Sequence, residues 1–266
     1  MYRELADHYR KEIFQCTRCQ QRLMNPYLHS NPKHDPPDSP QYPENRRRYQ
    51  LDYIASKRDV KLLVVGEAPG LDGCGYDGIA FTGEFNAVCH LGLTNYHGTV
   101  DSWQKEQSAN LIYGAVEAYC HNAGCTISQA ASKFYLTNAV MCVPLGKNGR
   151  SIASPAKATR LQCRENLVRQ VSILQPQAVL TLGANALGAV AVAFGLEIHG
   201  KLTDLVREQR QGNQYIAGPG FELLAEIHPS PRNRVLGDLY TALPGRLVNI
   251  FTRYLGRDLM ASERNK

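Results

Sequence analysis

The stretch Lys61–Glu84, KLLVVGEAPGLDGCGYDGIAFTGE, decides the fold of this chain. It opens with a short apolar run, Leu62–Val65, which ends abruptly in the loop Gly66-Glu67-Ala68-Pro69-Gly70. An apolar run of this length, bounded by glycine and proline, predicts a buried strand that ends in a tight loop. Because Gly66 frees the backbone and Pro69 stiffens it, the loop presents the carboxylate of Glu67 in a fixed place.

Further strands and helices are expected on both sides of this stretch. Strands are predicted over Phe134–Asn138, Ala178–Leu182 and Leu223–Ile227, and helices over residues 1–15, 109–122, 156–174, 184–194 and 243–255. This alternation predicts an α/β fold, a three-layer α/β/α sandwich around a central, mainly parallel four-stranded sheet. We expect a single domain over residues 1–266, in which an N-terminal helix, a CxxC and a Pro/Arg-rich loop (1–60) precede the α/β core (61–255).

Residues 25–48 are rich in proline, histidine and asparagine and show no hydrophobic periodicity. Such a segment predicts a long surface loop. Its last residues, Arg46-Arg47-Arg48, are expected to form a solvated basic patch, with a phosphate contact as the alternative.

The composition suits a folded protein with a polyanionic partner. Hydrophobic residues make up 43% of the chain, enough for a sizeable core, and the formal net charge is +6. Apolar runs long enough to span a bilayer are absent, and the first residues are charged rather than signal-like. We therefore expect a cytoplasmic protein without a membrane partner.

Chemistry-bearing residues follow the predicted strands directly. Glu67, Asn138 and His228 each come at or just after a strand end, and Gly183 follows another. In open α/β sheets, ligands bind in the crevice at the carboxyl ends of the strands, so we expect these residues to form one site. Phe81, which comes after the Glu67 loop, supplies a flat ring for a planar substrate.

Eight cysteines in a chain without a secretory signal point to metal or cofactor ligands rather than a disulfide framework. Cys16 and Cys19 form a CxxC half-site, and Cys142 and Cys163 are placed to complete it. Four thiolates suit either zinc or a [4Fe–4S] cluster, and spacing alone does not separate the two. The other cysteines, Cys74, Cys89, Cys120 and Cys125, are expected to be small buried residues, with a second half-site at Cys120 and Cys125 as the alternative.

Taken together, these motifs resemble the uracil-DNA glycosylase superfamily, most closely its iron–sulfur-containing branch. The likeness rests on Gly66–Gly70 followed by Phe81-Thr82-Gly83, on Thr137-Asn138 before Cys142, and on His228-Pro229-Ser230. It spans about residues 12–255, in the order and strand-end positions that the branch has.

The resemblance implies a monofunctional DNA glycosylase that hydrolyses the N-glycosidic bond of uracil or a modified pyrimidine flipped out of DNA, leaving an abasic site. It assigns catalysis to Glu67 and His228, where His228 stabilises the anionic base and Glu67 the sugar cation or the attacking water. It assigns base binding to Phe81, Asn138, Gly66, Ala68 and Gly70. DNA contacts are expected from Pro229, Ser230, Arg232, Arg234, Lys147 and Arg150. The implied cofactor is a [4Fe–4S] cluster on Cys16, Cys19, Cys142 and Cys163, and DNA is the implied partner of a monomer.

The sequence differs from that of the iron–sulfur branch at some positions, and these differences leave more than one candidate for the base that is excised. Gly70 stands where some branches use a tyrosine to exclude 5-substituted pyrimidines, and the segment 83–134 is longer than the resemblance leads us to expect. A glycosylase for bulky modified cytosine in foreign (phage) DNA is therefore one alternative, and a non-catalytic iron–sulfur DNA-binding module is another. A nucleotide-binding protein is disfavoured, because the chain has neither a Walker-type Gly-Lys-Ser/Thr nor a GxGxxG motif.

Overall fold

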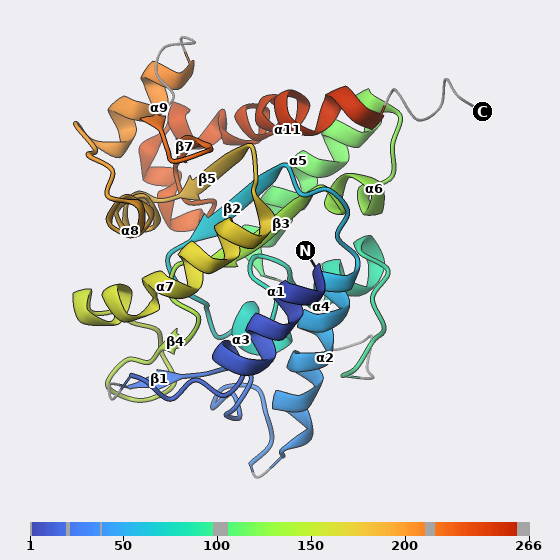
Figure 1. Cartoon of the computed structure of the whole chain (residues 1–266), viewed down its shortest axis with the longest axis vertical. Coiled ribbons are helices and arrows are strands. Elements are labelled where there is room, and N and C mark those ends of the chain that lie inside the picture. Colours follow the sequence, from blue (N-terminus) through green and yellow to red (C-terminus); the bar gives the residue numbers. More distant parts are fainter. Residues whose placement is uncertain (1, 20–21, 38, 98–105, 211–215, 260–266) are drawn as a thin grey trace.

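The computed structural model describes residues 2–19, 22–37, 39–97, 106–210 and 216–259. Its centre is a five-stranded sheet with the strand order β3-β2-β5-β7-β6 (Figure 1). The strands are β2 (Leu62–Gly66), β3 (Phe134–Asn138), β5 (Ala178–Leu182), β6 (Ile216–Ala217) and β7 (Glu222–Glu226). The order confirms the predicted α/β fold, with its mainly parallel sheet between helices.

The four parallel strands are the ones that the apolar runs predict. β2 pairs in parallel with β3 and with β5, and β5 pairs in parallel with β7. The expectation of four strands is wrong by one, because β6 adds an antiparallel edge strand beside β7. A strand of only two residues has no period to detect, so its sequence carries no signal.

Helices cover both faces of the sheet. α7 (Lys157–Leu174) passes in front of the sheet in Figure 1 and contacts α8 (Ala184–Phe194) and α1 (Tyr2–His8). On the other side, α5 (Gln107–Ala123) packs against α11 (Leu243–Leu259), and the rings of Phe134 on β3 and Phe251 on α11 lie 5.6 Å apart. Within the described residues, no helix is both long and apolar enough to cross a membrane.

Short elements connect these layers. They are η1 (Tyr9–Ile13, a π-helix), β1 (Leu23–Met24), α3 (Cys74–Asp77), α4 (Gly83–Phe85), η2 (Asn86–His90, a π-helix), α6 (Ile127–Ala131), β4 (Val143–Pro144), α9 (Leu202–Arg210), η3 (Pro231–Leu236, a 3₁₀-helix) and α10 (Asp238–Thr241). β1 and β4 pair antiparallel in a small second sheet, which ties the residues after the CxxC to those that follow β3.

The segment 25–48 is not simply a surface loop. Its last part belongs to a helix, α2 (Gln41–Ala55), and Tyr49 and Tyr53 on that helix are fully buried. The side chains of α2 bond directly to β3, since the amide nitrogen of Leu136 donates to the Tyr53 hydroxyl at 2.9 Å. Because tyrosines and polar groups form the buried face, the helix lacks the apolar stripe that sequence patterns detect.

Arg46 also contradicts the expected solvated patch. Its side chain is fully buried and forms an ion pair with the equally buried Asp35. The guanidinium also donates to the carbonyl oxygens of Tyr76 and Pro26, both at 3.0 Å, and of His29 at 3.1 Å. A guanidinium has five N–H donors, so one side chain can organise several loops around itself. Only the rest of the triplet reaches solvent.

Candidate active site

The loop after β2 and the end of β3 meet at the carboxyl edge of the sheet. Gly66 pairs with Asn138, and the amide nitrogens of Ala139 and Val140 donate to the carbonyl oxygens of Gly66 (2.8 Å) and Glu67 (2.9 Å). These bonds fix the Glu67 loop on the neighbouring strand end. The structure therefore places Glu67 and Asn138 at the same edge of the sheet, as their positions at strand ends predict.

Phe81 and Asn138 close around Gly66. A Cβ atom on Gly66 would lie 2.4 Å from Cζ of Phe81 and 2.5 Å from Oδ1 of Asn138, so only glycine lets the ring and the amide approach the strand end together. Phe81 and Asn138 are each 5% exposed. Within the described part of the chain, the side-chain amide of Asn138 makes no hydrogen bond, which leaves it able to bind the edge of a planar ring.

The backbone at Phe81 is held in a strained conformation. Its φ is +52°, a left-handed value that costs a non-glycine residue about 1–2 kcal/mol. Neighbouring side chains keep the loop in this shape: the amide nitrogen of Ile79 donates to Oδ1 of Asp77 at 2.7 Å, and the Thr82 hydroxyl donates to the Ala80 carbonyl at 3.0 Å. Strain of this kind persists where surrounding contacts enforce it, and it is common at functional sites.

His228 faces the same ring. The rings of His228 and Phe81 lie 5.7 Å apart, and Gly183, at the end of β5, passes so close that a Cβ atom there would lie 3.3 Å from Cβ of His228. The amide nitrogen of Ser230 donates to Nδ1 of His228 at 3.1 Å, which places the ring proton on Nε2. Burial lowers the pKa of His228 to about 4, so the imidazole is neutral near pH 7 and donates through Nε2.

Both oxygens of the Glu67 carboxylate are held from helix N-termini. Nη1 of Arg160, in the first turn of α7, lies 3.2 Å from Oε1, and Nδ2 of Asn185, in the first turn of α8, lies 3.0 Å from Oε2. The Glu67 side chain is 21% exposed and that of Arg160 is 30% exposed. The carboxylate is thus fixed in direction while one of its sides remains open to solvent.

Two side-chain hydrogen bonds hold the segment after His228. Ser230 accepts from the amide nitrogen of Arg232 at 3.4 Å, and Nδ2 of Asn233 donates to the His228 carbonyl at 2.7 Å. Pro229 is buried, whereas the side chains of Arg232 and Arg234 are exposed. Val235 is 88% exposed in the same segment.

The remaining predicted residues lie around this site or on a separate loop. Ala68 and Gly70 are partly exposed in the Glu67 loop, and a Cβ atom on Gly70 would have no atom of the described residues within 4 Å. Lys147 and Arg150 are exposed in the turn after β4, which a bond from the amide nitrogen of Gly146 to the Ser151 carbonyl closes at 2.8 Å. Within the described residues, no backbone hydrogen bond joins that turn to the His228 segment.

Cys16, Cys19 and Cys163 lie near enough to Cys142 to act on its thiol electrostatically. Burial, and then the nearby thiolates of the other three, raises the pKa of Cys142, and burial is also the main reason why the pKa of Cys163 is raised to about 11. The donor set, four thiols, fits an iron–sulfur cluster or zinc. Among the described residues, however, no three metal-ligating side chains are close enough to enclose an ion, and Sγ of Cys19 instead lies 3.2 Å from Oε1 of Gln162.

The other cysteines only partly meet the expectation of small buried residues. Cys74 and Cys120 are buried, but Cys125 is partly exposed and Cys89 is exposed. Cys120 and Cys125 lie close to each other across the left-handed Gly124, which ends α5. In the described part of the chain, this pair belongs to no group of three metal-ligating residues that could hold an ion.

Sequence reasoning missed the two residues that hold Glu67. Asn185 follows Gly183 by two residues, so the rule that strand ends carry the site would have pointed to it. Arg160 gives no such signal, because it lies on helix α7 and not at a strand end, although Cys163 follows it by three residues. Its position follows from the packing of α7 on the sheet.

Fold and site together describe an α/β protein in which an aromatic side chain, an amide and a neutral imidazole lie near a carboxylate at the carboxyl edge of the sheet. The family model of the uracil DNA glycosylase superfamily matches residues 54–244, and the chain belongs to that superfamily.

A solved structure shares the fold. The crystal structure of wild-type Pedobacter heparinus SMUG2 superposes with a TM-score of 0.59 and 15% sequence identity, over 100% of this chain and 98% of that one. This likeness concerns the fold alone. No curated protein matches the sequence significantly.

Proposed function

We propose that the chain is a monofunctional DNA glycosylase, which hydrolyses the N-glycosidic bond of uracil or another pyrimidine flipped out of DNA and leaves an abasic site. Membership of the superfamily supports the activity class. The observation that carries the assignment to this site is the packing of Phe81 and Asn138 against Gly66, with the ring of His228 5.7 Å from that of Phe81 and the fixed carboxylate of Glu67 on the same loop as Gly66.

In this proposal the base half of the reaction belongs to three side chains. Phe81 stacks on the flipped base, and the amide of Asn138 pairs with its edge. As the bond to the sugar breaks, negative charge grows on the base oxygens. The Nε2–H of His228 donates to one of them, and because the imidazole is neutral it does so without giving up a full proton.

The sugar half of the reaction belongs to Glu67. Positive charge builds on the sugar as the base leaves, and a carboxylate fixed by Arg160 and Asn185 stabilises it and orients the water that attacks the sugar carbon. Each carboxylate oxygen has two acceptor positions, so one on each oxygen remains for water. The exposed Arg232 and Arg234 and the backbone of Ser230 would bind DNA phosphates, with Lys147 and Arg150 adding positive charge.

We further propose that Cys16, Cys19, Cys142 and Cys163 hold a [4Fe–4S] cluster, with zinc as the alternative. Their gathering from the N-terminal segment, the residues after β3 and helix α7 supports this proposal. Bound there, the group would clamp these segments together, and the catalytic steps use none of its chemistry.

The test is a base-release assay on duplex and single-stranded oligonucleotides that carry uracil at one position, with abasic sites revealed by alkali. Release by the wild-type protein and not by Glu67→Gln, at equal DNA affinity, is the expected result. DNA binding without release from any substrate would instead favour the non-catalytic module.

A second candidate function is release of a bulky modified cytosine, as in chemically altered phage DNA. The open space at Gly70 favours it, because nothing in the described residues fills the side of the loop where other branches carry a tyrosine. Oligonucleotides with 5-substituents of increasing size separate the candidates. Faster release of the larger bases than of uracil supports the second one, and release confined to uracil excludes it.

A further inference from the structure

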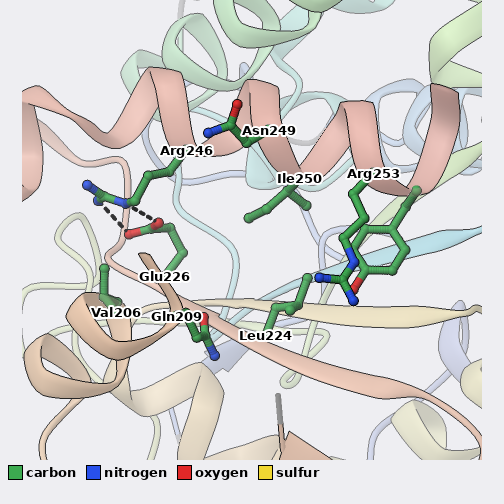
Figure 2. A pocket seen from close by; sticks show the side chains of 9 residues that line it. Val206, Gln209, Leu224, Glu226, Arg246, Asn249, Ile250 and Arg253 are labelled. Carbon is green, nitrogen blue, oxygen red and sulfur yellow. Dashed lines mark hydrogen bonds and ion pairs between the residues drawn. The ribbon is translucent and has the colours of Figure 1, made fainter. Parts of the chain in front are cut away.

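Two features of the fold lie apart from the glycosylase site. One is a pocket between α9, β7 and α11, where the charges of Glu226 and Arg246 cancel each other in an ion pair (Figure 2). The other is a pair of free thiols, Cys120 and Cys125, at the C-terminal end of α5. Two thiols that lie side by side can be joined by oxidation, so the second feature bears on covalent chemistry.

The backbone at the end of α5 brings the two cysteines together. The amide nitrogens of Gly124 and Cys125 both donate to the carbonyl oxygen of Cys120, the second of them at 3.1 Å. Gly124 has a φ of +67°, the left-handed conformation in which many helices end. The bond from Cys125 to Cys120 is that of a Schellman motif, in which the side chains of the two bonded residues are frequently in contact.

The side chains of the pair are in contact here as well. The Cys120 thiol lies within hydrogen-bonding range of Cys125, and this contact is the second reason, after burial, why the pKa of Cys120 is raised to about 12. A disulfide also requires that the two Cα atoms lie close together. The backbone hydrogen bond between the two residues meets this requirement.

The two thiols differ in their access to solvent. Cys125 is partly exposed, whereas Cys120 is 5% exposed. The ring of Tyr119, beside Cys120, lies 6.3 Å from that of Phe251 on α11, so this end of α5 is packed into the core. A dissolved reagent therefore reaches Cys125 first, and Cys120 reacts with a group that is already attached to Cys125.

We propose that Cys120 and Cys125 form a redox-active dithiol, which a low-molecular-weight disulfide oxidises to an intramolecular disulfide. In the first step the Cys125 thiol loses its proton, its sulfur attacks one sulfur of the reagent, and one small thiol leaves with that proton. In the second step the Cys120 sulfur attacks the Cys125 sulfur, and the second small thiol leaves with the proton of Cys120. Two electrons pass from the two protein thiols to the reagent, which is reduced to two thiols.

The bond would join the end of α5 to the segment that leads through α6 into β3. Since β3 begins at Phe134 and ends at Asn138, this segment meets the strand at the end opposite to the glycosylase site. The proposed dithiol is therefore independent of the proposed activity. Its oxidation can be measured without any DNA substrate, so the two proposals fail separately.

Glutathione disulfide is the probe, added to the full-length protein as purified. Free thiols are then alkylated, and peptide mass spectrometry gives the state of each cysteine. We expect a disulfide between Cys120 and Cys125 that an excess of reduced glutathione reverses. A protein in which both thiols stay free, or in which Cys125 keeps its glutathione, overturns the proposal.

Variants separate the two steps. Cys120→Ser blocks the second step, so glutathione on Cys125 should rise at least about tenfold above the wild-type level, because a neighbouring thiol acts at a high effective concentration. Cys125→Ser should leave the buried Cys120 free. Cys89→Ser is the matched control, since Cys89 is an exposed thiol on η2, and it should form the disulfide as the wild type does. Equal amounts of glutathione on Cys125 in the wild type and in Cys120→Ser contradict the proposal.

Discussion

Nδ2 of Asn185 lies 3.0 Å from Oε2 of Glu67, and this bond joins the first turn of α8 to the loop that ends β2. Together with the Arg160 bond to Oε1, it leaves the carboxylate little freedom to rotate. A catalytic group held in this way needs no reorganisation when charge develops on the substrate.

Asn185→Ala should therefore lower kcat while leaving KM for a uracil-containing duplex nearly unchanged. Loss of a hydrogen bond to a charged group corresponds to about 1.5–3 kcal/mol, or roughly 10- to 100-fold in rate. Single-turnover kinetics measure the effect, and Asn110→Ala, an exposed asparagine on α5, serves as the control. A variant that loses DNA affinity but keeps kcat would show that Asn185 binds DNA rather than positions Glu67.

His228 is expected to stay neutral throughout the physiological range. Burial places its pKa at about 4 against an ordinary value of 6.5, so the folded protein protonates it only as the pH falls through about 4. Since the unfolded chain binds the proton first, His228 disfavours folding increasingly as the pH falls from 6.5 to about 4. NMR titration of the His228 Cε1 proton checks this directly, and a midpoint near 6.5 would contradict the neutral-donor role.

Alanine substitution should reduce base release at Gly66 but not at Gly70, the other end of the Glu67 loop. Gly66→Ala would push a methyl group into Phe81 and Asn138, so we expect base release to fall by at least about 100-fold, the cost of misplacing catalytic groups by about 1 Å. Gly70→Ala meets open space and should leave uracil release intact. Gly70→Tyr should selectively impair release of 5-substituted bases. Equal losses in Gly66→Ala and Gly70→Ala, measured on one uracil duplex, would disprove this account of the pocket.

Replacement of Arg46 tests the unexpected core of the N-terminal region. Arg46→Met leaves Asp35 buried without its partner, and we expect a loss of about 3–5 kcal/mol in the free energy of unfolding. Urea denaturation measures this loss. Arg48→Met is the matched control, because Arg48 is half exposed, and its effect should stay within about 0.5 kcal/mol. Comparable stability of the two variants would contradict the structural role of Arg46.

Cys163→Ala should abolish the iron content of the purified protein if the four gathered thiols hold the proposed cluster. Cys89→Ala is the control, because Cys89 is an exposed thiol outside the set of four. It should leave the iron content unchanged. Iron and sulfide analysis together distinguish a cluster from zinc. Normal iron in Cys163→Ala would exclude this ligand set.

The sequence predicts the central sheet well because its parallel strands are buried on both faces. Such strands appear as continuous apolar runs, and the predicted bounds of Phe134–Asn138 and Ala178–Leu182 coincide with β3 and β5. Helix α2 escapes detection for the opposite reason, since its buried residues include Arg46, Tyr49 and Gln50 rather than an apolar stripe. Hydrophobicity patterns assign an arginine to the surface, and the burial of Arg46 depends on tertiary contacts that such patterns do not contain.

Some residues of the candidate site could likewise be predicted from the sequence, and others could not. Glu67, Asn138 and His228 could be grouped from sequence, because topology alone brings parallel strand ends together. Arg160 could not, since its contact with Glu67 depends on how α7 lies across the sheet. The tautomer of His228 was equally hidden, because it depends on the amide nitrogen of Ser230.

The superfamily match begins at residue 54, inside α2, although the bonds of that helix cross the boundary. Gln50, just before it, donates to the Tyr135 hydroxyl at 2.6 Å, and Tyr53 caps the amide nitrogen of Leu136. The N-terminal region is thus bonded directly to β3. Exchange of that region between relatives would remove two side-chain partners of the outer strand β3, so we expect the two parts to be inherited as one unit and to accumulate compensating substitutions across the boundary.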